Sequence, residues 1–362
     1  MNVIMALLSG HEVNILEGEE EKDQKENWKG YTNGLVRLHP GRWLFPGSYT
    51  KFANKLYEFR FKSNDVIVMT WPKCGTTWMQ EIVWTMRNSP DLNHPRLGSP
   101  INTRVPFIDT DMFLECSLLP PADPESSTAK HFQRLCPGKD PADGFFFQLT
   151  EAQPEPRTIK THLPISLFAP SLLDTAKVIY VVRNPKDVLV SYYHHVQLFI
   201  AMSYVGTLDK FVEYFLNDDL VYSPFWLHIK EAWEQKDHSN LHFVFYEDML
   251  RDIKNELKKL NKFLDTNLSD EQLEKVHHYT SFNEMKKRDN VFNEAHESND
   301  FMNSNYLETN GGFYRKGKSG SWKTKLNEDQ SQKVDEWIEK HLTPLGITFK
   351  EAEEMEINVT TS

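Results

Sequence analysis

The chain is poor in cysteine, in long apolar runs and in excess positive charge, and each shortage excludes a class of protein. Its 362 residues include three cysteines, Cys74, Cys116 and Cys136. Three are too few for a disulfide framework, and none shows the C-x-x-C spacing of a metal site. No segment reaches the roughly 18 apolar residues that a spanning helix needs. The 41 basic and 52 acidic residues give a net charge of −11, which argues against a general nucleic-acid surface.

The amino-terminal residues make a poor targeting signal. Met1 to Leu8 is apolar but short, has no basic residues before it and is followed by acidic residues from Glu17 to Glu26. We therefore expect a cytoplasmic protein without membrane insertion or a bound metal. Residues 1–35 are polar and acidic, and we expect them to form a mobile or loosely attached arm.

One stretch of the chain combines a strand pattern, a loop and a helix pattern. Residues 66–71 are apolar and β-branched, which predicts a buried strand. A helical period follows at Trp78, Ile82 and Met86. A strand that feeds a loop and then a helix points backbone N–H groups and the positive end of the helix dipole at one place.

The residues of this loop suit a terminal phosphate. Lys73 adds a full charge, Thr76 and Thr77 add hydroxyl donors, and Gly75 lets the backbone approach a ligand closely. The loop is not a Walker A motif, because G-x-x-x-x-G-K-[ST] is absent and the lysine precedes the glycine. The alternative is an ordinary strand-to-helix turn in which a threonine caps the helix.

Further strand and helix patterns alternate along the chain. Strands are predicted at 157–161, 177–182 and 241–246, and helices at 185–202, 208–215, 224–234 and 327–341. This alternation predicts a single α/β domain with a central parallel sheet flanked by helices. Ligands of such sheets bind beyond the carboxyl ends of the strands. The loop at 70–77 and the segments at 160–162, 183 and 246 all fall there.

Two other segments have open interpretations. Residues 311–323 interleave glycines with cations, which suits a second anion-binding loop, although a charge run is also typical of a solvated face. Residues 100–150 join apolar stretches through a connection rich in proline, alanine, aspartate and serine. A connection of this length is usually functional or disordered. It is either a lid over an apolar acceptor pocket or a surface insertion packed on the core.

Taken together, these segments resemble the cytosolic sulfotransferases, which transfer a sulfuryl group from 3′-phosphoadenosine 5′-phosphosulfate (PAPS). Residues 70–78, TWPKCGTTW, are similar to the family's 5′-phosphosulfate loop T-Y-P-K-S-G-T-T-W. Residues 180–193 resemble its 3′-phosphate segment, and residues 315–323 its R-K-G-x-x-G-x-W-K loop. Residues 160–162, Lys-Thr-His, resemble the segment with its catalytic histidine. The resemblance covers about residues 40–345.

The resemblance implies a P-loop-like PAPS site, release of PAP, and a role for each matching residue. His162 would be the general base and Lys73 would contact the bridging oxygen of the phosphosulfate. The residues implied to bind PAPS are Lys73, Cys74, Gly75, Thr76, Thr77, Trp78, Arg183, Ser191, Tyr246, Thr280, Ser281, Phe282, Met285, Phe313, Tyr314, Arg315, Lys316 and Gly317. Those implied to contact the acceptor are Phe107, Lys160, Thr161 and His162.

The charges of these residues agree with that ligand. PAPS carries about four negative charges, and Lys73, Arg183, Arg315 and Lys316 would offset them. A lone histidine is more often structural than catalytic. A position at a strand end beside Lys160 favours catalysis, because an imidazole with a pKa near 6.5 can accept a proton at cellular pH.

The chain also departs from the family pattern. Cys74 stands where serine is usual, and a thiol at a helix N-terminus beside a lysine is expected to be acidic and open to alkylation. The family's dimer segment K-x-x-x-T-V-x-x-x-E lacks its Thr-Val at residues 323–328, so a homodimer is possible but not indicated. The long insertion resembles those of insect sulfotransferases, including retinol dehydratase, which reaches its product through a sulfated intermediate.

Three functions follow as hypotheses. The first is a sulfotransferase acting on a small apolar hydroxyl compound of the phenol, steroid or retinoid type. The second is a dehydratase that works through a sulfated intermediate. The third is a PAPS- or PAP-binding protein without turnover, against which the presence of both His162 and Lys73 speaks.

Overall fold

The computed structural model describes residues 3–113, 127–288, 302–314 and 317–349. Its strands are β1 Val3–Ala6, β2 Glu12–Ile15, β3 Leu35–His39, β4 Trp43–Pro46, β5 Val66–Thr70, β6 Thr158–Thr161, β7 Lys177–Val182 and β8 Leu241–Phe245. Its helices are α1 Gly18–Asn27, α2 Tyr49–Tyr57, α3 Thr76–Asn88, α4 Ile101–Arg104, α5 Ser127–Leu135, α6 Phe145–Ala152, α7 Leu172–Thr175, α8 Pro185–Leu198, α9 Leu208–Leu216, α10 Phe225–Glu234, α11 Tyr246–Arg251, α12 Ile253–Leu264, α13 Asp270–Tyr279, α14 Phe282–Arg288, α15 Ser304–Asn310 and α16 Glu328–His341.

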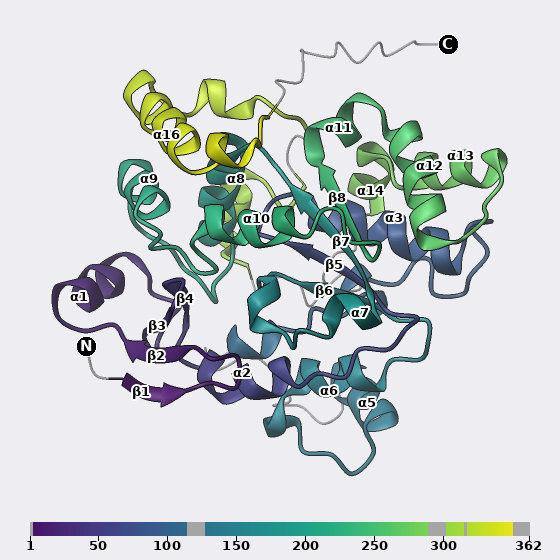
Figure 1. Ribbon diagram of the computed structural model, residues 1–362, viewed down its shortest axis with the longest axis horizontal. Coiled ribbons are helices and arrows are strands. Elements are labelled where there is room, and N and C mark those ends of the chain that lie inside the picture. The colour runs from purple at the N-terminus through teal and green to yellow at the C-terminus, as the bar shows by residue number, and fades with distance from the viewer. Residues whose placement is uncertain (1–2, 114–126, 289–301, 315–316, 350–362) are drawn as a thin grey trace.

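The centre of the molecule is a parallel sheet with the strand order β6-β5-β7-β8 (Figure 1). All four strands predicted from the sequence are present, and the prediction of a central parallel sheet flanked by helices is confirmed. The chain leaves β5 toward β6 on one side and leaves β7 toward β8 on the other. The loops after β5 and β7 therefore diverge, which is the arrangement that opens a binding crevice in such sheets.

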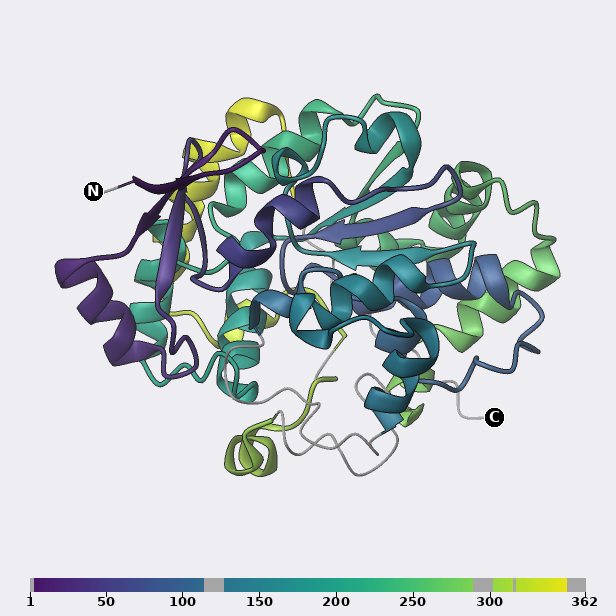
Figure 2. The same ribbon diagram turned by 90° about the horizontal axis from the view of Figure 1, so that it is seen from below.

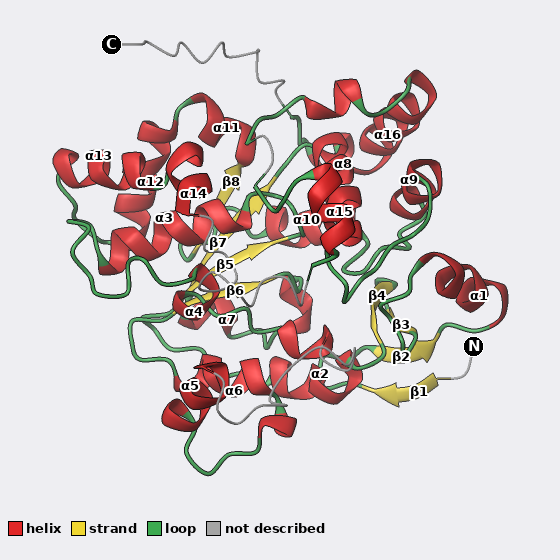
Figure 3. Ribbon diagram, turned by 180° about the vertical axis from the view of Figure 1, so that it is seen from behind, coloured by secondary structure: helices red, strands yellow, loops and turns green. Residues whose placement is uncertain are grey.

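Both faces of this sheet are covered, which explains why its strands read as continuous apolar runs. Val66 and Val68 pack in one core with α3, α12 and α13, whereas Ile67 and Met69 face a second core with α8, α9 and α10. Figures 2 and 3 show the helices on the two sides of the sheet.

The expectation of a mobile arm at residues 1–35 is wrong for the described residues. Strands β1 to β4 form an antiparallel sheet in chain order (Figure 1). Val13, Leu16 and Trp28 are buried in the main core. Polar composition misled the prediction, because one alternating face of a strand and a few aromatic residues are enough to dock a mostly polar segment.

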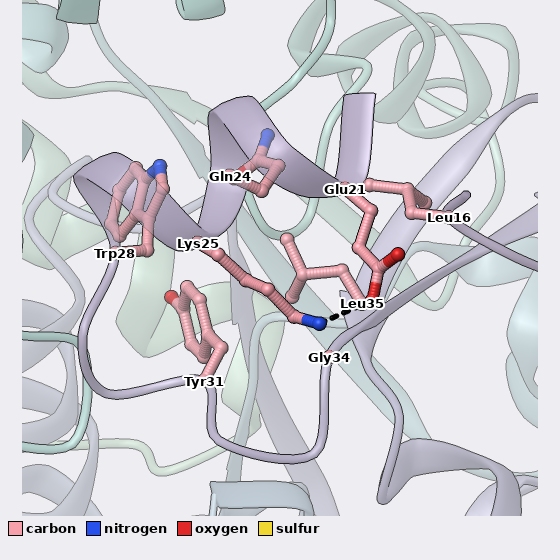
Figure 4. Close-up of a pocket in the computed structure, with 8 residues that line it drawn as sticks. All are labelled: Leu16, Glu21, Gln24, Lys25, Trp28, Tyr31, Gly34 and Leu35. Atoms are coloured by element: carbon pink, nitrogen blue, oxygen red, sulfur yellow. Dashed lines mark hydrogen bonds and ion pairs between the residues drawn. The ribbon is translucent and has the colours of Figure 1, made fainter. Parts of the chain in front are cut away.

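A small pocket lies between α1 and the start of β3, well separated in sequence from the predicted site (Figure 4). It has room for about one water molecule. Its polar side includes the ion pair between Lys25 and Glu21. An ion pair of this exposed kind contributes little to stability, and the pocket is too small for a substrate.

The described part of the 100–150 segment is helical. Helices α5 and α6 pack on each other through Phe132, Cys136, Phe145 and Leu149. Asp111 accepts hydrogen bonds from the N–H groups of Phe146 and Phe147, at 3.1 and 2.7 Å, and so fixes the start of α6. Whether the segment is a lid stays a prediction, and its residues 114–126 lie outside the described part. None of the helices described is long and apolar enough to cross a membrane.

Candidate active site

The loop between β5 and α3 has an unusual backbone. Lys73 has φ 70° and Gly75 has φ 103°, and a non-glycine residue in the left-handed region is uncommon and often functional. A Cβ atom on Gly75 would lie 2.6 Å from Cδ2 of Tyr246, so only glycine fits beneath that ring. The loop therefore opens the 13-residue helix α3 with its N–H groups clear of side chains.

Arg183 follows the end of β7 and connects this loop to the second glycine-rich loop, which contains Lys318. Its guanidinium donates to the carbonyl oxygens of Lys73, at 3.2 Å, and Lys318, at 3.0 Å, and lies 4.5 Å from the ring centroid of Tyr246. Its Nε atom is enclosed, and the described residues offer it no acceptor. A buried donor without an acceptor is rare, and a phosphate oxygen would satisfy it.

Asp187, on the first turn of α8, holds the second glycine-rich loop in place. Its carboxylate accepts hydrogen bonds from Ser319 Oγ and Gly320 N, both at 2.7 Å, and from Ser321 Oγ at 3.1 Å. A Cβ atom on Gly317 would lie 2.3 Å from the ring of Phe282. The loop is thus fixed between α8 and α14. No role for Asp187 was predicted from the sequence.

The remaining described residues implied to bind PAPS lie on or beside α3, α8, α13 and α14. Trp78 packs edge-on against Tyr246 at 5.8 Å, and its enclosed Nε1 has no acceptor among the described residues. The Thr280 hydroxyl is engaged by Val276 O at 2.8 Å. Ser281 precedes α14, Met285 is buried on it, and Ser191 lies along α8. Arg315 and Lys316 lie outside the described residues. The glycine cradles and the two unmatched donors fit an anionic nucleotide.

Cys74 corrects the expectation of a reactive thiol. The side chain is fully buried in the core, with Sγ 3.9 Å from the carbonyl oxygen of Pro72. Burial raises the pKa of this thiol far above its ordinary value, and the nearby Arg183 only partly offsets that effect. Only the backbone of Cys74 remains available to a ligand. The sequence pattern could not show which way this side chain points.

We therefore expect Cys74 to resist alkylation in the folded protein. Because the thiolate is the nucleophile and burial suppresses it, iodoacetamide at pH 8 should label Cys74 at least 10²-fold faster in guanidinium than in buffer, by peptide mass spectrometry. Rapid labelling of Cys74 in buffer, with the protein still folded by circular dichroism, would contradict this orientation.

His162 follows β6 and lies against the end of β5. Its Nδ1 is 2.8 Å from the carbonyl oxygen of Thr70 and 3.1 Å from the hydroxyl of that residue. Because a carbonyl oxygen only accepts, Nδ1 carries the ring proton and Nε2 keeps a lone pair. Burial, with a smaller effect of Lys160, holds the pKa of His162 well below 6.5. The ring is thus neutral at pH 7 and presents Nε2 as a base.

A group of buried residues supports His162. Asp109 Oδ2 accepts hydrogen bonds from the His162 backbone N–H at 3.2 Å and from Tyr222 Oη at 2.7 Å. His228 Nε2 donates to the carbonyl oxygen of His162 at 3.0 Å. The sequence missed all three of these residues, because they come from distant segments and match no motif.

Lys160 and Phe107 lie beside His162. A short parallel bridge joins Phe107 to Lys160, whose Nζ lies 3.9 Å from that ring centroid. The Phe107 ring also packs edge-on against His162 at 5.0 Å. Burial lowers the pKa of Lys160 below its ordinary value, and the charge of Asp109 opposes that effect. Thr161 is buried, and its hydroxyl accepts from Leu163 N at 3.0 Å.

Glu247, at the start of α11, is a buried carboxylate that the sequence did not reveal. Its Oε1 accepts from the Asn184 backbone N–H at 2.9 Å, and its enclosed Oε2 has no donor among the described residues. Burial raises its pKa to about 7, against hydrogen bonds and the charge of Arg183. In the unfolded chain, the Glu247 carboxyl has its ordinary pKa of 4.5. Stability therefore falls as pH rises from about 4.5 to about 7, and the full penalty remains above that.

Glu247→Gln is expected to stabilise the protein above pH 7 by about 1–3 kcal/mol, with the gain shrinking toward pH 5. Guanidinium unfolding at pH 5 and pH 8.5 measures it. The control is Glu256→Gln. Burial raises the pKa of Glu256, but bonds from His242 and Lys259 outweigh it and the net shift is downward. That substitution should destabilise the protein at pH 8.5. Equal effects of both substitutions would contradict the assignment.

Comparisons with known proteins agree with this geometry. The family model described as "Sulfotransferase domain" matches residues 63–346. Sulfotransferase 1B1 of Canis lupus familiaris is 32% identical over 310 residues, which are 84% of this chain and 93% of the relative. Luciferin sulfotransferase of Photinus pyralis is 28% identical over 316 residues, 86% of this chain and 81% of the relative.

Two solved structures are similar to this chain over most of its length. Retinol dehydratase in complex with androsterone and the inactive cofactor PAP has a TM-score of 0.77 and 27% identity, covering 94% of this chain and 98% of that one. The complex of retinol dehydratase with retinol and PAP has a TM-score of 0.74 and 28% identity, with coverages of 94% and 99%.

Proposed function

The chain belongs to the sulfotransferase domain family and is a PAPS-dependent sulfotransferase, and on that premise we propose that it acts on the hydroxyl of a small apolar acceptor with His162 as general base. The observation that carries the proposal is the tautomer of His162. Its Nδ1–H is bound to Thr70 O at 2.8 Å, which leaves Nε2 to accept the hydroxyl proton. A phenol, steroid or retinoid type of acceptor is consistent with the aromatic surroundings of Phe107 and Phe313.

The roles of the chain's residues follow from their positions. PAPS supplies the sulfuryl group. The α3 N-terminus, with Gly75, Thr76 and Thr77, would hold its 5′ side, and Arg183 with the loop at 317–320 its 3′ side. His162 Nε2 would take the acceptor's proton as the new S–O bond forms. Lys73 would stabilise the electron pair that the old S–O bond leaves on the departing phosphate.

A dehydratase is the second candidate, favoured by the TM-scores of 0.77 and 0.74 to retinol dehydratase. The acceptor decides between the two outcomes, because a sulfated allylic alcohol can lose sulfate. A homodimer and a cytosolic location stay predictions.

The test is sulfate transfer from ³⁵S-labelled PAPS to a panel of phenols, androsterone and retinol, with product masses recorded. Sulfated products with the phenols or the steroid would support the proposal. An anhydro product from retinol would support the dehydratase. Binding of PAP by calorimetry without labelled product from any acceptor would overturn both and favour a non-catalytic PAP-binding protein.

A further inference from the structure

Two adjacent histidines on α8 have different surroundings. His194 is paired on both ring nitrogens, with Tyr306 Oη at 3.0 Å from Nδ1 and the carbonyl oxygen of Gly312 at 3.3 Å from Nε2. His195 points elsewhere. Its Nδ1 is fully enclosed and has no hydrogen-bond partner among the described residues.

His195 lies near Lys73, with Phe313 as the shared neighbour. Its ring is 6.3 Å from that of Phe313, whose centroid is 4.3 Å from Lys73 Nζ. Burial is the main reason that the pKa of His195 lies well below its ordinary value, and the charges of Lys73, Lys160, His162 and His194 lower it further. The ring is neutral at pH 7 and offers one donor and one acceptor.

Among the described residues, the ring contacts of His195 are with aromatic side chains. Phe199 lies at 4.5 Å and Tyr192 at 6.1 Å between ring centroids, and the Tyr192 hydroxyl is directed at Val221 O, 3.5 Å away. A buried polar atom without a partner is rare, and it costs stability unless a ligand or water pairs with it. An unmatched polar atom thus lies on a side chain whose ring neighbour, Phe313, contacts Lys73.

We propose that His195 determines acceptor specificity by hydrogen-bonding a second polar group of the acceptor. The inference rests on the sulfuryl transfer proposed above. The preferred acceptors are then compact aromatic or alicyclic alcohols that carry another hydroxyl, carbonyl or amine, and not hydrocarbons with a single hydroxyl. Sites that hydrogen-bond a substrate group discriminate strongly against analogues that lack it.

The test compares 2-naphthol with 2,3-, 2,6- and 2,7-dihydroxynaphthalene, which place the second hydroxyl at three separations. The readout is the ratio of kcat/KM to that of 2-naphthol, halved where two hydroxyls can react. In the unaltered enzyme at least one isomer should exceed 2-naphthol by about 10-fold or more. His195→Phe should bring that ratio to about 1. His195→Asn, which keeps a polar atom near the position of Nδ1, should restore most of it.

His194→Phe is the matched control, and it should leave the ratio unchanged. Equal ratios in the unaltered enzyme and the His195→Phe variant would overturn the inference while leaving the sulfotransferase proposal intact. A ratio near 1 for all three isomers in the unaltered enzyme would do the same. Absence of labelled product from every naphthol, androsterone and retinol would instead refute the proposed function.

Discussion

His162→Ala should lower kcat for 2-naphthol by about 10²–10⁴ while leaving the affinity for PAP nearly unchanged. The substitution removes the Nε2 atom, which carries the one ring lone pair that the tautomer of His162 leaves for the acceptor's proton. PAP should still bind, because Arg183 contacts the β5 loop at Lys73 and the second loop at Lys318, whereas His162 contacts Thr70. Labelled-sulfate transfer gives kcat, and calorimetry gives the PAP affinity.

His162→Asn separates proton transfer from structural support. Asparagine can keep a donor to Thr70 O but has no atom at the position of Nε2, so this variant should be as inactive as alanine. An acidic acceptor supplies a second test. 4-Nitrophenol is largely ionised near pH 7.5 and needs little help from a base. The fall in its kcat on His162→Ala should therefore be smaller than the fall for 2-naphthol by about 10-fold or more. Equal losses for both acceptors, or an active asparagine variant, would mean that His162 only supports the site.

The parallel sheet was predictable because its pattern is local. The β5 residues alternate between two apolar cores, so the whole strand reads as apolar and β-branched. Phosphate-loop chemistry is also local, since Lys73, Gly75 and Thr76 are close neighbours in the chain. Strand ends in a parallel sheet lie together, and the sequence thereby placed His162 and Arg183 near this loop.

Features that depend on distant contacts were not predictable. The amino-terminal sheet exists because strands β2 to β4 pair with one another and dock Trp28 on the core, whereas the composition of residues 1–35 indicates an arm. Cys74 faces the core and not the ligand side. Asp109 and Glu247 became buried carboxylates through packing that no motif encodes.

The two loops predicted to bind the nucleotide show the same contrast between local and distant contacts. The sequence assigned Arg183 to a phosphate, but its hydrogen bonds to two loop carbonyls add a second role, the alignment of both loops. Asp187 performs the matching task for the second loop through three hydrogen bonds. Both roles require knowing which loops face each other, which sequence spacing alone does not give.

Lys73→Met should lower kcat by about 10²–10³ and change the affinity for PAP much less. Its ammonium group lies 4.3 Å from the ring centroid of Phe313, in the loop between β5 and α3. If that charge meets the bridging oxygen, its effect is greatest when negative charge builds on the leaving phosphate. An interaction that strengthens only in the transition state changes kcat, not ground-state binding.

Arg183→Met supplies the contrast. A charged hydrogen-bonding group that holds PAPS and PAP alike contributes uniform binding, so its loss should raise the dissociation constant of PAP about 10–100-fold and lower kcat less. Transfer rates at saturating PAPS and calorimetric titration of PAP separate the two patterns. If Lys73→Met weakened PAP as much as Arg183→Met and kept its kcat, Lys73 would be a simple phosphate contact. If instead Lys73→Met mainly lowered kcat and Arg183→Met mainly weakened PAP binding, Lys73 would stabilise the leaving group and Arg183 would anchor the nucleotide.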